Sequence, residues 1–196
     1  MTVAQTLCVL GDGLVSGFGD ARQLGWVGRV LARTHTTDPL FTATLPVIGE
    51  TTTSLAARWQ EETSRRWIPD APRFLALAPG AADVNAGLSL ARSRLNLANV
   101  VDQARAEGTA VFVVGPAPSR ATEGRAAAAL SKAWSDVCDR RDIPFVECHE
   151  PLAANSQWLA DIDLTDGVHP TQVGYGLVAW LVLHHRWHDW LGATET

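Results

Sequence analysis

The stretch TLCVLGDGLVSGFGD, residues 6–20, runs from an apolar segment through Gly11-Asp12-Gly13 into residues compatible with a helix. An apolar run that stops at such a turn predicts a strand, a loop and then a helix. That arrangement is a common way to present a catalytic side chain, yet residue 13 is a glycine and has none. The rest of the chain decides whether this loop is only structural or belongs to a site.

Short β-rich runs and segments with helical spacing alternate along the chain. The β-rich runs cover residues 6–10, 41–47, 73–77, 110–114 and 144–146, and the helical segments cover residues 24–33, 53–66, 90–108, 122–140 and 174–191. Within 90–108, Leu97, Val101 and Ala104 share one helix face, and Gly108 is suited to end the helix. Because parallel strands need crossover connections, the alternation predicts a three-layer α/β/α sandwich with a five-stranded parallel sheet.

Size and composition favour a single domain that spans residues 1–196. The chain is 46% hydrophobic and 19% charged, which is typical of a compact soluble protein. A net charge of -5 without a basic run argues against a nucleic-acid surface, so a small-molecule partner is favoured. The bias toward arginine over lysine, with abundant Ala, Gly and Trp, indicates a GC-rich bacterial genome.

The cysteines and the apolar segments carry no further signal. Cys8, Cys138 and Cys148 are odd in number and form no Cys-x-x-Cys pair, so we expect reduced thiols, without disulfides or a zinc site. We find neither a secretory signal nor about 18 consecutive apolar residues, which favours a cytoplasmic protein without a membrane contact. No cofactor is predicted.

Three histidines near the carboxyl terminus resemble a metal cluster. His184, His185 and His188 belong to a Trp-rich segment that is predicted to be helical. Charge at the helix end and packing explain them better, so we predict no metal site.

Loops at the carboxyl ends of the strands are where ligands bind in sheets of this kind. Four loops stand out: residues 11–13, 47–52 and 79–83, and residues 165–171, which precede the last predicted helix. Taken singly, each has an ordinary structural explanation, since Asp12 can cap a helix and the glycines can make turns.

Together the four loops resemble the sequence blocks of the SGNH hydrolases, also called GDSL esterases and lipases. Further similar segments are residues 25–29, 55–59 and 115–118. The stretch DGVHP, residues 166–170, followed by Gly174-Tyr175, is the most specific piece, and the resemblance covers residues 7–191. It implies the flavodoxin-like α/β fold of that family.

The resemblance also implies a set of site residues, and two of the four do not match. The family uses a serine nucleophile after Gly-Asp, a glycine and an asparagine as oxyanion donors, and an Asp-x-x-His pair. Gly49, Asp166 and His169 match, whereas Gly13 stands at the serine position and Ala82 at the asparagine position. Removing such a nucleophile lowers turnover about 10⁶-fold, so ordinary acyl-enzyme catalysis is not expected.

The matched Asp-x-x-His pair is chemically plausible. Pro170 biases His169 toward an extended backbone, and Gly167 lets the loop fold Asp166 back toward the imidazole. The carboxylate would then set the imidazole tautomer and stabilise the imidazolium. The alternative is a capping aspartate and a surface histidine.

None of the neighbouring hydroxyl or thiol groups convincingly replaces the serine. The hydroxyl of Ser16 is expected to bond a carbonyl of the preceding turn, and Cys8 belongs to the core. The threonines of residues 51–53 are expected to cap the next helix, with Thr52 or Thr53 at its start.

The remaining candidates are two carboxylates and the backbone of the loops. Asp12 and Asp83 can act as acids, bases or substrate clamps, with helix capping as the alternative. Gly13 and Gly49 carry N–H groups that can polarise a substrate oxygen, while Gly13 and Ala82 are expected to enlarge the pocket floor. Three neighbouring polar residues are predicted to be solvated: Glu50, Asn85 and Arg120.

Three functions stay open. In the first, His169, backed by Asp166 and assisted by Asp12, moves protons on a bound small molecule in a cyclisation, elimination or isomerisation, as in specialised metabolism. The second is a non-catalytic ligand-binding pseudoenzyme. The third is an esterase that is inactivated or that uses water activated by His169. The matched dyad favours the first.

Overall fold

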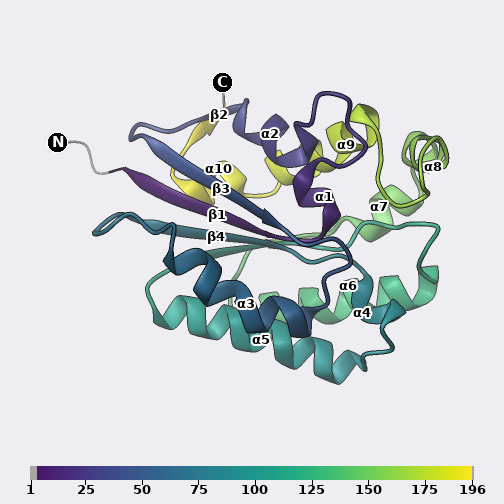
Figure 1. The fold of residues 1–196 in the computed structure, drawn as a ribbon, viewed down its shortest axis with the longest axis horizontal. Helices are drawn as coiled ribbons and strands as arrows, with labels where there is room; N and C mark the ends of the chain where they lie inside the picture. The colour runs from purple at the N-terminus through teal and green to yellow at the C-terminus, as the bar shows by residue number, and fades with distance from the viewer. Residues whose placement is uncertain (1–3, 196) are drawn as a thin grey trace.

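The computed structural model describes residues 4–195 and has a parallel sheet at its centre (Figure 1). The strands of this sheet are β1 (Gln5–Gly11), β3 (Leu40–Pro46), β4 (Arg73–Ala78), β5 (Ala110–Val114) and β6 (Phe145–Val146). Their order is β3-β1-β4-β5-β6, and every neighbouring pair is parallel. The predicted α/β/α architecture and all five predicted strands are therefore confirmed.

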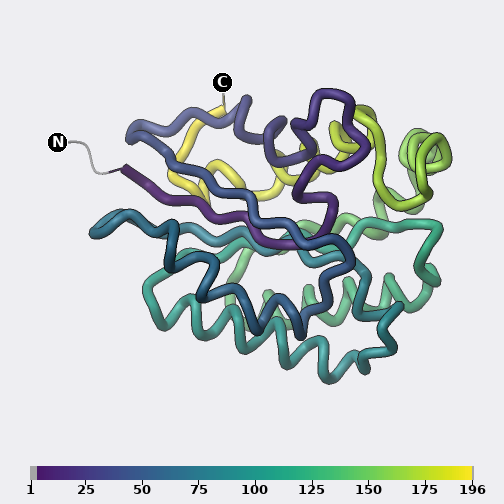
Figure 2. The backbone as a smooth tube through the Cα atoms, viewed as in Figure 1, coloured from purple at the N-terminus to yellow at the C-terminus, as the bar shows by residue number. Residues whose placement is uncertain are grey.

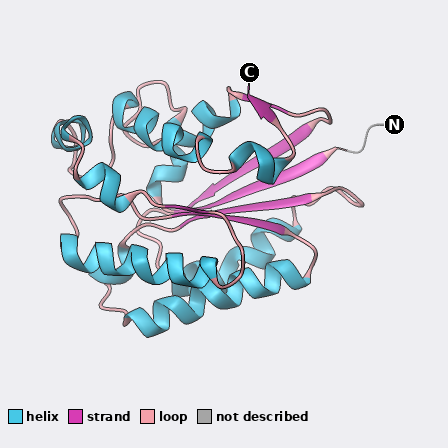
Figure 3. Cartoon of the chain, turned by 180° about the vertical axis from the view of Figure 1, so that it is seen from behind, coloured by secondary structure: helices cyan, strands magenta, loops and turns pink. Residues whose placement is uncertain are grey.

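Helices cover both faces of the sheet (Figures 1 and 3). One face carries α1 (Gly13–Ser16), α2 (Gly25–Leu31), α7 (His149–Ala153), α8 (Ser156–Asp163), α9 (Gln172–Leu183) and α10 (Trp187–Leu191). The other face carries α3 (Thr52–Ser64), α4 (Ala82–Asn85), α5 (Leu90–Ala106) and α6 (Gly124–Asp139). A short antiparallel pair, β2 (Thr34–His35) with β7 (Thr194–Glu195), was not predicted.

Strand β1 is buried on both faces. Its side chains alternate between the two layers, as the two-residue period of a strand requires. Leu7 and Val9 pack in the layer that contains α2 and α9, while Cys8 and Leu10 pack in the layer that contains α3 and α5, and all four are fully buried. The apolar run at the start of the chain therefore supplies the middle of both cores.

The chain leaves neighbouring strands in opposite directions. After β1 it turns to the face of α1 and α2, whereas after β3 and β4 it turns to the face of α3 and α5 (Figure 2). Loops that diverge in this way leave a crevice at the carboxyl ends of the strands. The fold therefore opens a site beside the Gly11-Asp12-Gly13 turn.

The helix predicted for residues 174–191 is in fact two helices. Arg186, with φ 54° and ψ 14°, has left-handed backbone geometry and separates α9 from α10. The break turns the buried Trp187 edge-on to Phe112, with the ring centroids 5.3 Å apart. Packing against the sheet, which local spacing does not reveal, explains this difference.

The three cysteines lie inside the protein. Cys8, Cys138 and Cys148 are buried and unbonded. Burial raises the pKa of both Cys8 and Cys138 to about 12, so these thiols stay protonated. Within residues 4–195, no helix combines the length and the apolar character that crossing a membrane requires.

The carboxyl end of β1 yields a first prediction. A Cβ atom on Gly11 would lie 2.0 Å from the carbonyl oxygen of Ala78 in the neighbouring strand. We expect Gly11→Ala to lower the free energy of unfolding by about 3 kcal/mol, because strand backbone cannot yield as a side chain does. Gly176→Ala is the matched control: a Cβ there meets nothing within 4 Å, and the helix gains up to about 1 kcal/mol.

Urea unfolding of both variants measures the difference. Equal stability of Gly11→Ala and the unmodified protein would contradict the packing described for β1.

Candidate functional site

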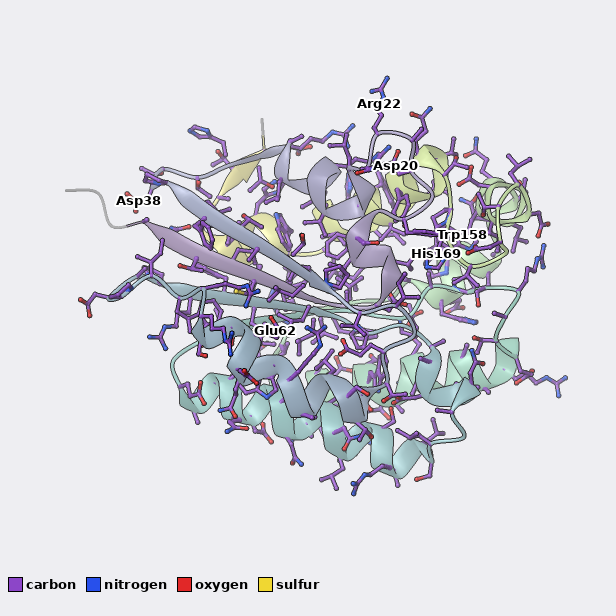
Figure 4. The ribbon with its side chains drawn as sticks, in the orientation of Figure 1. Asp20, Arg22, Asp38, Glu62, Trp158 and His169 are labelled. Carbon is purple, nitrogen blue, oxygen red and sulfur yellow. The ribbon has the colours of Figure 1, made fainter. Side chains whose placement is uncertain are left out.

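A cavity of about 240 Å³ lies at the carboxyl ends of the strands. His169 lies at this end of the sheet, whereas Asp38 lies at the opposite end, near the start of β3 (Figure 4). The lining includes these predicted site residues: Asp12, Gly13, Gly49, Ala82 and His169. Two hollows of about 510 Å³ lie elsewhere, one between α2 and α9 and one in the loop after α1, and neither contains a predicted site residue.

A hydrogen bond joins the imidazole of His169 to Asp166. Nδ1 lies 2.7 Å from Oδ2 of Asp166, and the backbone N–H groups of His169 and Val168 donate to Oδ1 at 2.8 and 2.9 Å. Partial burial of the carboxylate raises its pKa, but these hydrogen bonds outweigh that effect and lower the pKa of Asp166 to about 2. Asp166 is therefore a permanent anion that holds the proton of His169 on Nδ1.

The loop that carries His169 is held by contacts from other segments. Gly167, at φ 77°, accepts a hydrogen bond from the N–H of Arg120 at 2.7 Å. The guanidinium of Arg120 forms two 2.8 Å hydrogen bonds with Asp163, so Arg120 is not simply solvated as predicted. Phe18 packs edge-on against the imidazole, with centroids 4.8 Å apart. The orientation of the His169 imidazole is therefore fixed by its hydrogen bond to Asp166 and by its contact with Phe18.

The imidazole lies directly against Gly13. A Cβ atom on Gly13 would be 2.3 Å from Nε2 of His169, well inside the 3.0 Å that real Cβ atoms keep. The expectation that Gly13 enlarges the pocket floor is therefore wrong, because the imidazole occupies that space. Ala82 does line the cavity.

Asp12 lines the cavity and has a perturbed carboxyl group. Its Oδ1 accepts the N–H of Leu14 at 3.0 Å, so it also caps α1. Removal from water raises the pKa of Asp12 to about 6, although the Leu14 N–H and the charge of His169 oppose the shift. Asp12 can therefore hold or release a proton near neutral pH.

Two backbone amides border the same cavity. Gly13 is the first residue of α1, and Gly49 has φ 70° in a turn closed by the N–H of Glu50 bonding to Val47 O at 3.2 Å. Neither glycine N–H has an acceptor among residues 4–195. Both are free to donate to an oxygen of a bound molecule.

Asp83 does not line the cavity, so its prediction as a substrate-binding residue is wrong. Its carboxylate is buried and accepts hydrogen bonds from Thr52 N at 2.7 Å, from Thr52 Oγ1 at 2.6 Å and from the hydroxyl of Ser93. These bonds connect α4 to the first turns of α3 and α5. A buried carboxylate satisfied in this way is structural.

Glu50 and the nearby hydroxyls also have structural partners. Glu50 is 2% exposed and pairs with Arg58, so its prediction as a solvated residue is wrong. Thr51 caps α3 and Thr52 is its first residue, as predicted. Ser16 donates to Gly13 O at 2.6 Å, as predicted.

Sequence reasoning did not find two hydroxyls that line the cavity, Ser119 and Thr122. Asn85, predicted to be solvated, also lines it. The sequence did indicate the loop, because residues 115–118 follow β5 and resemble a family segment. The spacing of its residues does not show which side chains face the cavity.

A model of the GDSL-like Lipase/Acylhydrolase family matches residues 9–177. The chain belongs to this family. Its geometry agrees, since the Asp-x-x-His loop and the loop after β1 meet at one cavity. No curated protein matches the sequence of this GDSL-like chain.

Solved structures support the fold of the GDSL-like chain. A lipase/acylhydrolase from Enterococcus faecalis is 18% identical, with 98% of each chain covered and a TM-score of 0.75. TesA is 22% identical, with 91% of this chain and 96% of that chain covered and a TM-score of 0.72. The acetylxylan esterase Axe2 from Geobacillus stearothermophilus is 18% identical, with 93% and 95% covered and a TM-score of 0.71. At these identities the similarity shows the fold alone.

The contact between Gly13 and His169 yields a second prediction. Gly13→Ala introduces a Cβ that forces the imidazole to retreat by roughly 1 Å to reach ordinary contact distance. We expect it to lower the free energy of unfolding by about 1–3 kcal/mol, and to have no such effect in a His169→Ala background.

A double-mutant cycle with urea unfolding measures this coupling. Additive effects of the two substitutions would mean that the imidazole does not occupy the space beside residue 13.

The pKa of Asp12 yields a third prediction. Between its ordinary value of 3.8 and about 6, the folded protein binds more protons at Asp12 than the unfolded chain, so stability falls as pH rises through this window. Asp12→Asn removes this loss. The fall in the free energy of unfolding between pH 4 and pH 7–8 should therefore be about 1–3 kcal/mol smaller for Asp12→Asn than for the unmodified protein.

Denaturant unfolding at several pH values tests this, with Asp139→Asn on the exposed end of α6 as the control. Parallel pH profiles for Asp12→Asn and the unmodified protein would show that Asp12 titrates normally.

Proposed function

We propose that this GDSL-like chain is an enzyme that performs non-covalent acid–base chemistry on a small molecule. His169 accepts and donates the proton, and Asp12 is the second acid–base group. Asp166 orients the imidazole and balances its positive charge once it is protonated. Cyclisation, elimination and isomerisation are reactions that need this pair and no covalent intermediate.

The observation that carries the proposal is the dyad at the cavity. The hydrogen bond of 2.7 Å from Nδ1 to Asp166 leaves Nε2 of His169 as the nitrogen that faces Gly13. A histidine fixed in one tautomer beside a cavity is the usual arrangement of a general base.

The hydroxyl groups around the dyad favour a non-covalent reaction. An activated nucleophile needs its base within about 2.6–3.2 Å. No hydroxyl of residues 4–195 is hydrogen-bonded to Nε2 of His169: Ser16 bonds to Gly13 O, and Thr52 bonds to Asp83. Residue 13, which stands where the family has its serine, has no side-chain hydroxyl.

Two titratable side chains that line the cavity support proton transfer in both directions. The raised pKa of Asp12, about 6, makes it a proton donor at mildly acidic and neutral pH. His169, oriented by the ionised Asp166, lines the same cavity and is the group that accepts the proton.

Exchange of carbon-bound protons tests the proposal without knowledge of the natural substrate. We expect the protein in D₂O to replace α-protons of some members of a panel of neutral lactones, β-keto amides and ketones, followed by ¹H NMR. His169→Ala should lower the exchange rate about 10²–10⁴-fold, because it removes the general base. Asp166→Asn should lower it by up to about 10⁴-fold, through loss of the correct tautomer.

His184→Ala is the matched control, because His184 is an exposed histidine that stacks on Trp180 outside the cavity. Exchange that persists in His169→Ala would rule out the proposed base. Binding of panel members without any exchange would instead support a non-catalytic ligand-binding protein.

A second function, ester hydrolysis by water that His169 activates, is favoured by one observation. The free N–H groups of Gly13 and Gly49 border the cavity and can hold a carbonyl oxygen as its charge develops. Hydrolysis of p-nitrophenyl acetate that depends on His169 and shows no burst of p-nitrophenol would establish it. A stoichiometric burst from the unmodified protein would contradict both non-covalent functions.

A further inference from the structure

Three uncharged polar side chains of the cavity have no hydrogen-bond partner among residues 4–195. They are the hydroxyls of Ser119 and Thr122, in the loop after β5, and the amide of Asn85, at the end of α4. Other polar groups near the site, such as Asp83 and Glu50, are fully engaged with the protein. The three free groups are therefore available to a bound molecule, which would displace the water that serves them otherwise.

The order of the strands arranges the cavity by polarity. Ile48, which is 65% exposed, follows β3, Asp12 follows β1, Asn85 lies after β4, and Ser119 and Thr122 follow β5. From β3 to β5 there are three strand spacings of about 4.8 Å, or roughly 14 Å in all. The cavity thus has an apolar end, a middle with the acid–base groups and a polar end.

The charges of the lining disfavour an anionic ligand. Asp12 and His169 are its titratable side chains, and no Lys or Arg of residues 4–195 contributes to it. A buried anion would have no permanent cation to pair with and would lose its hydration. A cation would find only Asp12, whose Oδ1 already accepts the N–H of Leu14. A neutral hydrogen-bonding ligand faces neither difficulty.

We propose that the ligand of this cavity is a neutral, elongated molecule that bonds Ser119, Thr122 and Asn85 through a hydroxyl or amide and lays an apolar chain against Ile48. This assignment rests on the proposed function, because it fills the same site and sets the middle of the ligand beside His169 and Asp12. At about 240 Å³ the cavity is smaller than typical pockets for drug-sized ligands, so the molecule is small.

Three probes of equal chain length separate the effect of charge: hexanamide, hexanoate and hexylammonium. We expect hexanamide to bind at least tenfold more tightly than either ion in an NMR titration of the ¹⁵N-labelled protein at pH 7.5. Its amide should shift the signals of Asn85, Ser119 and Thr122, and its terminal methyl group should show contacts to Ile48.

A double variant tests the polar end. Ser119→Ala/Thr122→Val removes both hydroxyls with little change of shape and should weaken hexanamide binding about tenfold or more, since each hydrogen bond contributes a factor of several. Ser135→Ala, at a half-buried serine on α6 outside the cavity, is the control and should bind hexanamide as the unmodified protein does. An unchanged ¹H–¹⁵N spectrum outside the cavity shows that each variant is folded.

Tighter binding of hexanoate or hexylammonium, unchanged hexanamide binding by the double variant, or no binding of any probe would each overturn the assignment. The result is separable from the proposed function. Selective hexanamide binding in a protein that exchanges no α-protons would support the assignment and contradict the catalytic role of His169. Exchange activity without this selectivity would do the reverse.

Discussion

The carboxyl end of β1 has no room for a side chain on either glycine of its turn. A Cβ on Gly11 would lie 2.0 Å from Ala78 O, and one on Gly13 would lie 2.3 Å from Nε2 of His169. The first contact lets β1 pair closely with β4 while both faces of β1 are buried. The second brings the imidazole against the backbone of the loop. The sheet and the site therefore meet at one close-packed turn, and Asp12 is the side chain that this turn presents.

The two carboxylates near the site, Asp166 and Asp12, differ because their surroundings differ. Asp166 accepts three hydrogen bonds and keeps a side chain that is 48% exposed, so its pKa falls to about 2. Asp12 is removed from water with the single N–H of Leu14 as its partner, so its pKa rises to about 6. The same chemical group thus serves as a fixed anion in one place and as a proton donor in the other.

Membership in the GDSL-like family describes the scaffold and leaves the chemistry to the site, since one fold supports many reactions. In this chain the scaffold carries the hydrogen-bonded Asp166–His169 pair and two backbone N–H groups, of Gly13 and Gly49, without an acceptor among residues 4–195. The imidazole lies where a side chain of residue 13 would begin, and the hydroxyls of the cavity lie after β5. A proton-transfer reaction on a neutral molecule is consistent with the hydrogen-bonded dyad, with the imidazole beside Gly13 and with the hydroxyls after β5.

The sequence by itself determined the five strands, the helices predicted for residues 24–33, 53–66, 90–108 and 122–140, and the parallel sheet. The strands and helices follow from patterns within a few residues, such as the apolar run of β1 and the helical spacing of α5. The pairing of Asp166 with His169 was implied by the resemblance of residues 166–170 to a sequence block of the SGNH hydrolases. Tertiary structure alone decided that Asp83 is buried against Thr52 and Ser93. It also decided that Ser119 and Thr122 line the cavity, and that the imidazole of His169 occupies the space beside Gly13. The reason is that the direction of a side chain, and the space left beside it, depend on segments that are distant in sequence and meet only in the folded chain.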